Sequence, residues 1–184
     1  MSHDGSYWAQ KLRRLIVSDL RRLGYARGKW SGFVLRPYES VVHFVDVHFS
    51  RREHIPFVEV QFCVSSLTLM RLVGFCHYVE KEDFSAHLIW RLGSLMGLEG
   101  NEPVPYPESE EVYSEQARKI PVALHEGHRR SISIRSIQEL FLRMNAEPSA
   151  CAVHPLMREF LEGRHDGSLP EIGFEEWRDT RARL

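Results

Sequence analysis

An acid and a histidine lie two residues apart in the apolar run VVHFVDVHFS, which spans Val41–Ser50. In a β-strand, residues two apart point to the same face, so Asp46 and His48 are expected side by side. Such a pair can bind a metal ion or orient a general base, although it is more often a hydrogen-bonded pair on a half-exposed sheet. No third ligand follows at a fixed spacing. Asp46 and His48 are therefore candidates for a metal-assisted hydrolase, as an alternative function.

The segment LHEGHRR, at Leu124–Arg130, places His125 and His128 three residues apart with two arginines directly after them. His-x-x-His occurs at metal sites, and adjacent arginines can hold a phosphate. The zinc-protease pattern needs histidines four residues apart, and that spacing is absent. Because Gly127 weakens a helix here, the sequence favours a polar loop. His125 and His128 are alternative metal ligands beside the pair on the strand.

The cysteines give little sign of chemistry. Cys63, Cys76 and Cys151 are odd in number and show no Cys-x-x-Cys spacing, which argues against a disulfide framework or a structural zinc site. The sequence also contains no glycine-rich phosphate-binding motif. We therefore predict no cofactor and no catalytic residue.

Basic residues concentrate at the start of the chain. Residues 1–36 hold eight lysines and arginines against two aspartates, a net charge of +6, with Tyr25, Trp30 and Phe33 among them. Basic and aromatic side chains together suit single-stranded nucleic acid. The residues that would bind it are Arg13, Arg14, Arg21, Arg22, Lys29 and Trp30. The isoelectric point near 6.8 argues against a dedicated nucleic-acid binder, so this function is a second alternative.

Acidic residues concentrate in residues 99–115, which hold six glutamates and no basic residue. Three prolines at alternate positions in the same stretch predict an acidic, proline-rich linker or loop. A concentrated negative patch suits a basic cleft on a partner protein. The candidate partner-binding residues are Glu102, Glu108, Glu110, Glu111 and Glu115.

The elements that would position these residues belong to an α+β fold. The chain has 184 residues, of which 43% are hydrophobic, so it can bury a core, and its apolar runs are too short to span a membrane. Apolar residues from Trp8 to Leu23 recur every three or four positions, which predicts a helix that ends before Gly24. This helix is expected to pack on an antiparallel meander of three to four strands, followed by a helical C-terminal half.

Changes in periodicity place the remaining elements. Strands are predicted at Trp30–Arg36, Val41–Ser50, Phe57–Ser65 and Leu69–Val79. Helices are predicted at Phe84–Met96, from Ser131 or Ser133 to Asn145, at Ala150–Leu161 and at Phe174–Leu184. The predicted organisation is an α+β domain at 1–98, the acidic linker or loop at 99–115, and a helical region at 116–184 packed on the first part as one unit.

One stretch resembles a known family. A helix ending in Leu23-Gly24-Tyr25 is followed by Trp30, by the strand Val41–Ser50 that ends in serine, and by the FVEV of Phe57–Val60. In this order, over about residues 20–66, they resemble the opening of an uncharacterised bacterial domain-of-unknown-function family. Some of its members look like toxin-immunity proteins. The resemblance implies a protein partner such as a toxin, and it carries over no catalytic residue.

These observations favour a non-enzymatic protein-binding module of the bacterial cytoplasm, of the kind of an immunity- or antitoxin-like inhibitor. The first residues lack the apolar core of a signal peptide, so the cytoplasm is the expected compartment and no membrane association is predicted. The metal-assisted hydrolase and the nucleic-acid-binding module are the alternatives. The sequence does not indicate an oligomeric state.

Overall fold

The structure is a computed structural model, and it describes residues 5–28, 32–35, 41–50, 56–66, 70 and 86–152. Its helices are α1 (Gly5–Arg22), α4 (Leu92–Leu95), α5 (Glu110–Ile132) and α6 (Ile137–Ala146), with short 3-10 helices η1 (Glu99–Asn101) and η2 (Pro148–Ala150). Its strands are β1 (Ala26–Arg27), β2 (Phe33–Leu35), β3 (Val41–Ser50), β4 (Phe57–Ser66), β5 (Leu88–Arg91) and β6 (Val104–Pro105). The predicted class, an N-terminal helix with an antiparallel sheet and later helices, is confirmed.

Among the described residues, the sheet has six strands in the order β1-β2-β3-β4-β5, and β6 also pairs with β4. In the antiparallel pair β1–β2, Arg27 lies opposite Phe33. In the antiparallel pair β4–β6, Val58 lies opposite Val104. Two of the six strands, β1 and β6, are only two residues long, which is too short for a pattern of alternation to reveal them.

Strand β5 corrects one sequence prediction. The helix predicted at Phe84–Met96 is wrong over Leu88–Arg91, where Leu88 and Trp90 are buried and Ile89 and Arg91 are partly exposed. That alternation is typical of a strand. Strand β5 is followed directly by the single turn of α4. The leucines of these two elements together imitate the spacing of one helix, although they belong to a strand and to a separate turn.

Contacts divide the chain into two compact units. Among the described residues, the first unit comprises 5–28, 32–35, 44–50, 56–63 and 90–133, and the second comprises 41–43, 64–66, 70, 86–89 and 134–152. The predicted boundaries at residues 98 and 116 do not coincide with this division, because both lie inside the first unit.

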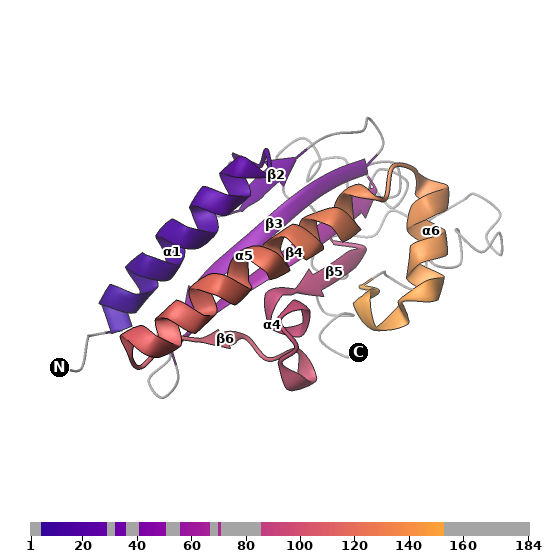
Figure 1. Cartoon of the computed structure of the whole chain (residues 1–184). Coiled ribbons are helices and arrows are strands. Elements are labelled where there is room, and N and C mark those ends of the chain that lie inside the picture. Colours follow the sequence, from indigo (N-terminus) through magenta and orange to yellow (C-terminus); the bar gives the residue numbers. More distant parts are fainter. Residues whose placement is uncertain are drawn as a thin grey trace. The chain divides into compact units, whose positions relative to one another are not determined.

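In the first unit, α1 and α5 lie side by side over the sheet and run in the same direction (Figure 1). Trp8 of α1 contacts the ring of Tyr113 near the start of α5, with centroids 5.7 Å apart. At the other end, the Tyr25 hydroxyl lies 3.3 Å from the Ser131 hydroxyl. The two helices therefore form one layer against the strands.

Helix α1 forms as predicted because one stripe of its surface is apolar. Trp8, Leu12, Ile16 and Leu20 follow at four-residue steps, and all are buried. Gly24 comes after the last turn with a φ of 90°, a conformation that favours glycine at a helix C-terminus.

Helix α5 begins inside the segment that was predicted to be a loop. The Ser109 side chain accepts a hydrogen bond from the backbone N–H of Val112, at 3.3 Å, and caps the helix. Glu110 and Glu111 occupy the first turn, where their negative charges interact favourably with the positive end of the helix dipole. Residues 110–115 are thus helical, and the cap residue with its acidic first turn is the local reason.

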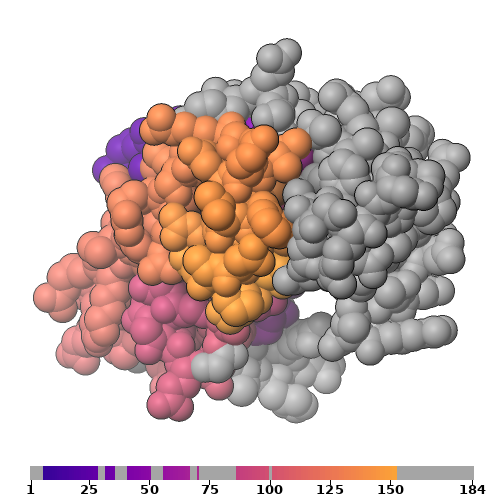
Figure 2. All heavy atoms as spheres, turned by 90° about the vertical axis from the view of Figure 1, so that its right-hand side faces the viewer, coloured from indigo at the N-terminus to yellow at the C-terminus, as the bar shows by residue number. Residues whose placement is uncertain are grey.

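The second unit is built around buried aliphatic side chains that include Leu88, Leu140 and Met144. His43 is also buried, and its Nε2 lies 3.0 Å from the backbone oxygen of Ile134. Helix α6 lies at the surface in this unit (Figure 2), and the Leu142 side chain on it is 67% exposed.

Several predicted elements lie outside the described residues. Of the predicted strand Leu69–Val79, only Met70 is described. The predicted helix Phe174–Leu184 and residues 153–161 of the predicted helix Ala150–Leu161 also lie outside the described residues. Within the part that is described, no helix combines the length and the apolar character needed to cross a bilayer.

Candidate functional site

The polar side of α1 carries a regular series of arginines. Arg13, Val17 and Arg21 follow at four-residue steps, so their side chains form one stripe along the helix. Arg14 lies beside this stripe and Arg22 belongs to the last turn. Because the apolar stripe of α1 is turned to the core, these cationic side chains remain at the surface.

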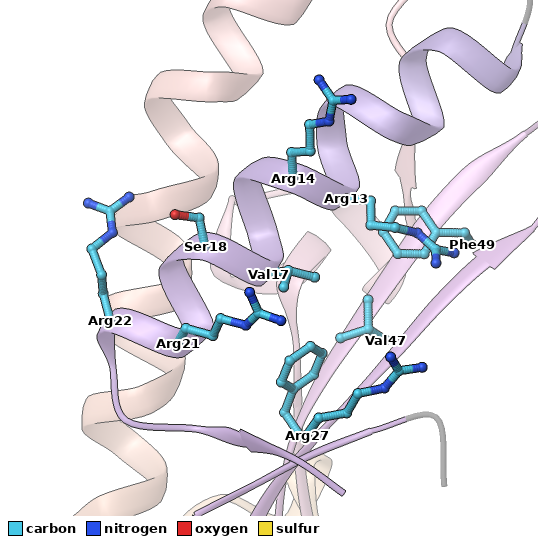
Figure 3. Close-up of a pocket in the computed structure, with 10 residues that line it drawn as sticks. Arg13, Arg14, Val17, Ser18, Arg21, Arg22, Arg27, Val47 and Phe49 are labelled. Atoms are coloured by element: carbon cyan, nitrogen blue, oxygen red, sulfur yellow. The ribbon is translucent and has the colours of Figure 1, made fainter.

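A groove of about 750 Å³ runs along this part of the first unit (Figure 3). We call it the arginine groove, and its lining residues come from α1, β1, β2 and β3. They are Arg13, Arg14, Val17, Ser18, Arg21, Arg22, Arg27, Phe33, Val47 and Phe49. Five of these ten are arginines and none is acidic, so the groove combines positive charge with an apolar floor.

Three of the arginines extend over the same apolar floor. Figure 3 shows Arg13, Arg21 and Arg27 on the side of α1 that faces Val47 and Phe49. The guanidinium carbon of Arg13 lies 4.6 Å from the centre of the Phe49 ring, in a cation–π contact. The floor is formed because alternate residues of β3 present Val47 and Phe49 to the same face.

Among the described residues, charge compensation in the groove is incomplete. Asp19 forms an ion pair with Arg22, which points to the other side of α1 from the apolar floor (Figure 3). Within the described part of the chain, Arg13, Arg21 and Arg27 form no ion pair. Like charges that gather without a counterion favour the binding of an anion.

Sequence reasoning named much of this lining and missed the rest. Arg13, Arg14, Arg21 and Arg22 all line the groove, whereas Lys29 and Trp30 lie outside the described residues. The missed members include Arg27 and Phe49. Arg27 was counted in the basic segment, and the alternation along VVHFVDVHFS places Phe49 on the same face as Val47, but no pattern in the sequence joined them to α1.

The acidic candidates divide into two groups. Glu110 forms an ion pair with Lys11 at 2.7 Å, and Glu115 forms one with Lys119 at 2.6 Å. The hydrogen bond and the charge of Lys119 lower the pKa of Glu115. The remaining candidates are exposed and have no ion pair among the described residues; they are Glu102, Glu108 and Glu111.

The structure separates the residues proposed as metal ligands. Asp46 and His48 are exposed on the face of β3 opposite to Val47, as their spacing predicts. His125 and His128 are on α5, which packs with α1 over the Val47 face. Among the described residues, no group of three or more histidines, cysteines or carboxylates is arranged to hold a metal ion.

The polar loop predicted at Leu124–Arg130 is wrong, since this segment lies within α5. Its arginines are engaged: Arg129 and Arg130 both donate to the Glu126 carboxylate, at 2.7–2.8 Å. These hydrogen bonds, first from Arg129 and then from Arg130, lower the pKa of Glu126 to about 2. The two arginines that the sequence suggested as phosphate ligands therefore already bind a carboxylate of the same helix.

A serine, a tyrosine and a histidine meet beneath the end of α5. The Tyr25 hydroxyl lies 3.3 Å from both the Ser131 hydroxyl and His128 Nδ1. Burial raises the pKa of Tyr25 to about 12, so the phenol stays protonated. Ser131 is 1% exposed. Because substrate has no access to its hydroxyl, this cluster anchors α5 to the turn after α1 and does not form a nucleophilic site.

Two of the three cysteines lie among the described residues, and neither lines the arginine groove. Cys63 is buried in β4, and Cys151 is half-buried after η2. Cys76 lies outside the described residues.

The fold and the groove define an α+β protein with an arginine-lined groove on its surface. No family model matches the chain, and neither the curated proteins nor the solved structures yielded a match. The resemblance of residues 20–66 to an uncharacterised bacterial family stays a prediction.

Proposed function

We propose that this protein binds nucleic acid through the arginine groove. The observation that carries the proposal is the convergence of Arg13, Arg21 and Arg27 over the floor formed by Val47 and Phe49. Lysine and arginine side chains that neutralise phosphates supply most of the affinity in sequence-independent nucleic-acid binding. An aromatic ring among them adds a surface on which a base can stack.

The spacing of the arginines supports a polymer of phosphates. Arg13 and Arg21 are eight residues apart in α1, which corresponds to about 12 Å along a helix. Successive phosphates on one nucleic-acid strand are separated by at least about 3.4 Å along the axis, so this distance spans several nucleotides. A strand that lies along the groove can therefore contact the two arginines with different phosphates.

The charge of the whole chain explains why composition alone argued against this function. The net charge is −1, so the molecule has no general attraction for polyanions. Local fields nevertheless act over about a Debye length, roughly 8–10 Å at physiological ionic strength. We therefore expect binding to depend on the groove rather than on the protein as a whole.

The test is the binding of a fluorescently labelled oligonucleotide of 12 thymidines to the full chain, followed by anisotropy at 25–200 mM salt. If Arg13, Arg21 and Arg27 contact phosphates, the logarithm of the association constant falls with that of the salt concentration with a slope of about −2. Arg21→Gln and Arg27→Gln should each weaken binding and make this slope shallower by about 0.7. Arg118→Gln is the matched control, because Arg118 is exposed on α5 and is not among the groove residues.

Two outcomes would contradict the proposal. The first is an absence of binding at 25 mM salt to the oligonucleotide and to a duplex of the same length. The second is an equal loss of affinity in Arg118→Gln and in the two groove variants, since binding would then follow total charge.

The protein-binding function stays a prediction with weaker support. Two of its five candidate residues, Glu110 and Glu115, are already paired with lysines of this chain. Glu102, Glu108 and Glu111 are exposed, and they alone would be available to a basic partner. The nucleic-acid proposal has the better support because its groove joins charge, shape and an aromatic floor.

A further inference from the structure

The contact between Arg13 and Phe49 has a geometry that suits a nucleobase. The guanidinium carbon lies 4.6 Å from the ring centre, so the ring supports the guanidinium from one side. Phe49 is half-buried in β3, whereas Arg13 is exposed on α1. Arg13 lines the groove and is exposed, so its guanidinium is accessible from the groove while Phe49 lies on one side of it (Figure 3).

A guanidinium group held in this way is a stacking surface. It is planar and delocalised, it is only weakly hydrated, and it stacks on π-systems. Proteins that read unpaired bases commonly stack them on aromatic rings or on arginine planes. Phe49 fixes the orientation of the group in advance, so little further conformational entropy is lost when a base arrives.

The surroundings of Arg13 match the rest of a nucleotide strand. Arg21 lies two helical turns further along the same stripe of α1, and Arg27 reaches the same floor from β1. Neither forms an ion pair among the described residues. Both lie towards the C-terminal end of α1 from Arg13, so they can take phosphates on that side of a base stacked at Arg13.

We infer that the arginine groove binds single-stranded nucleic acid, with one base stacked on the outer face of the Arg13 guanidinium. Phe49 supports that guanidinium from beneath, and Arg21 and Arg27 hold the neighbouring phosphates. The inference rests on the proposed nucleic-acid function and names its ligand more narrowly. A duplex is a poorer ligand because its bases are already paired and stacked.

The experiment compares three labelled probes of 12 nucleotides at one low salt concentration: oligothymidine, an oligomer of abasic sites with the same phosphates, and a duplex. The stacking of one base is worth about 1 kcal/mol or more. We therefore expect oligothymidine to bind the full chain at least about fivefold more tightly than the abasic oligomer. It should also bind more tightly than the duplex.

Two variants separate stacking from charge. Arg13→Lys keeps the positive charge and removes the planar group, and Phe49→Leu keeps an apolar floor and removes the ring. Each should reduce the preference for oligothymidine over the abasic oligomer to near one, because the base then has no supported planar group on which to stack. The controls are Arg118→Lys on α5 and Phe44→Leu on the opposite face of β3, which should keep the preference.

The outcomes distinguish this inference from the proposed function. Equal affinity of the wild-type chain for oligothymidine and the abasic oligomer would overturn the stacking inference and leave phosphate binding intact. An unchanged preference in Arg13→Lys and Phe49→Leu would overturn it as well. Failure of all three probes to bind would instead overturn the proposed function. Full inhibition by thymidine monophosphate at concentrations near the strand's own dissociation constant would replace the strand by a free nucleotide and would also overturn the inference.

Discussion

The ammonium group of Lys11 lies among three aromatic rings. Its Nζ is 4.2 Å from the centre of the Tyr113 ring, 5.0 Å from that of Tyr7 and 5.2 Å from that of Trp8. It also donates to the Glu110 carboxylate at 2.7 Å. The hydrogen bond to Glu110 is the largest contribution that raises the pKa of Lys11. One charged side chain therefore links the start of α1 to the start of α5.

Replacing Lys11 by methionine tests this link. Lys11→Met keeps an apolar stem of similar length and removes both the cation–π contacts and the ion pair. We expect Lys11→Met to lower the thermal midpoint of unfolding relative to the wild type. This decrease should exceed the decrease caused by Lys119→Met by a few degrees. The control removes an ion pair between neighbouring turns of α5, and both of its side chains are exposed. Equal midpoints for the two variants, measured by circular dichroism, would contradict a special role for the Lys11 contacts.

The positions of the groove residues within their own elements could be predicted from the sequence, but the contacts between elements could not. Arg13 and Arg21 could be predicted to share a stripe of α1 because helical periodicity fixes the angle between them. Phe49 could be placed on one face of β3 for the same reason. The contact between Arg13 and Phe49 could not be predicted, since it depends on how α1 packs on the sheet.

At the scale of elements, predictability follows length and regular period. Helix α1 and strand β3 were predicted close to their observed bounds because many residues repeat one pattern. Strand β5 was not, because four residues are too few to separate a period of 2 from one of 3.6. Helix α5 was partly missed because Gly127 favoured the prediction of a break in the helix. The glycine is explained by a contact with a residue outside α5.

Gly127 leaves room for a buried aromatic ring. A Cβ at this position would lie 2.4 Å from Cδ2 of Phe62, which is fully buried in β4. Helix propensity alone predicts that Gly127→Ala stabilises the protein by about 1 kcal/mol. We expect the opposite sign: a lower free energy of unfolding, by about 1–3 kcal/mol, because the ring has to shift. Urea denaturation measures this difference.

A second substitution provides the control. If the loss arises from the contact, Gly127→Ala combined with Phe62→Leu should be more stable than the sum of the two single effects predicts. Additive effects, or a Gly127→Ala variant that is more stable than the wild type, would show that Phe62 does not require the glycine.

At the scale of the molecule, a net charge of −1 conceals two opposed segments. The basic N-terminal segment and the acidic segment at residues 99–115 meet in the first unit, where Lys11 of one pairs with Glu110 of the other. Part of the acidic charge thus serves the fold. The arginines on the sheet side of α1 line the groove. The basic residues of the N-terminal segment therefore fall into two groups: Lys11 stabilises the fold, and the groove arginines are available for binding.

Stability of the whole molecule should depend on pH through His87. This residue of the second unit is 1% exposed, and its Nδ1 accepts a hydrogen bond from the backbone N–H of Ser66 at 3.0 Å. Burial lowers the pKa of His87 from 6.5 to about 4. The folded state therefore holds a neutral ring, with its acceptor nitrogen already occupied.

As the pH falls from 7 towards 4, the unfolded chain protonates this histidine first, so stability is complete above pH 6.5 and is lost progressively below it. The difference between 6.5 and about 4 corresponds to about 3 kcal/mol. His87→Gln keeps a hydrogen-bond acceptor that does not titrate, so the variant should be less stable at pH 7 and should lose less stability on acidification. His125→Gln is the control, because His125 is exposed on α5. Urea denaturation at pH 7, 6, 5 and 4 measures both slopes, and parallel curves for wild type and His87→Gln would assign the acid sensitivity to other groups.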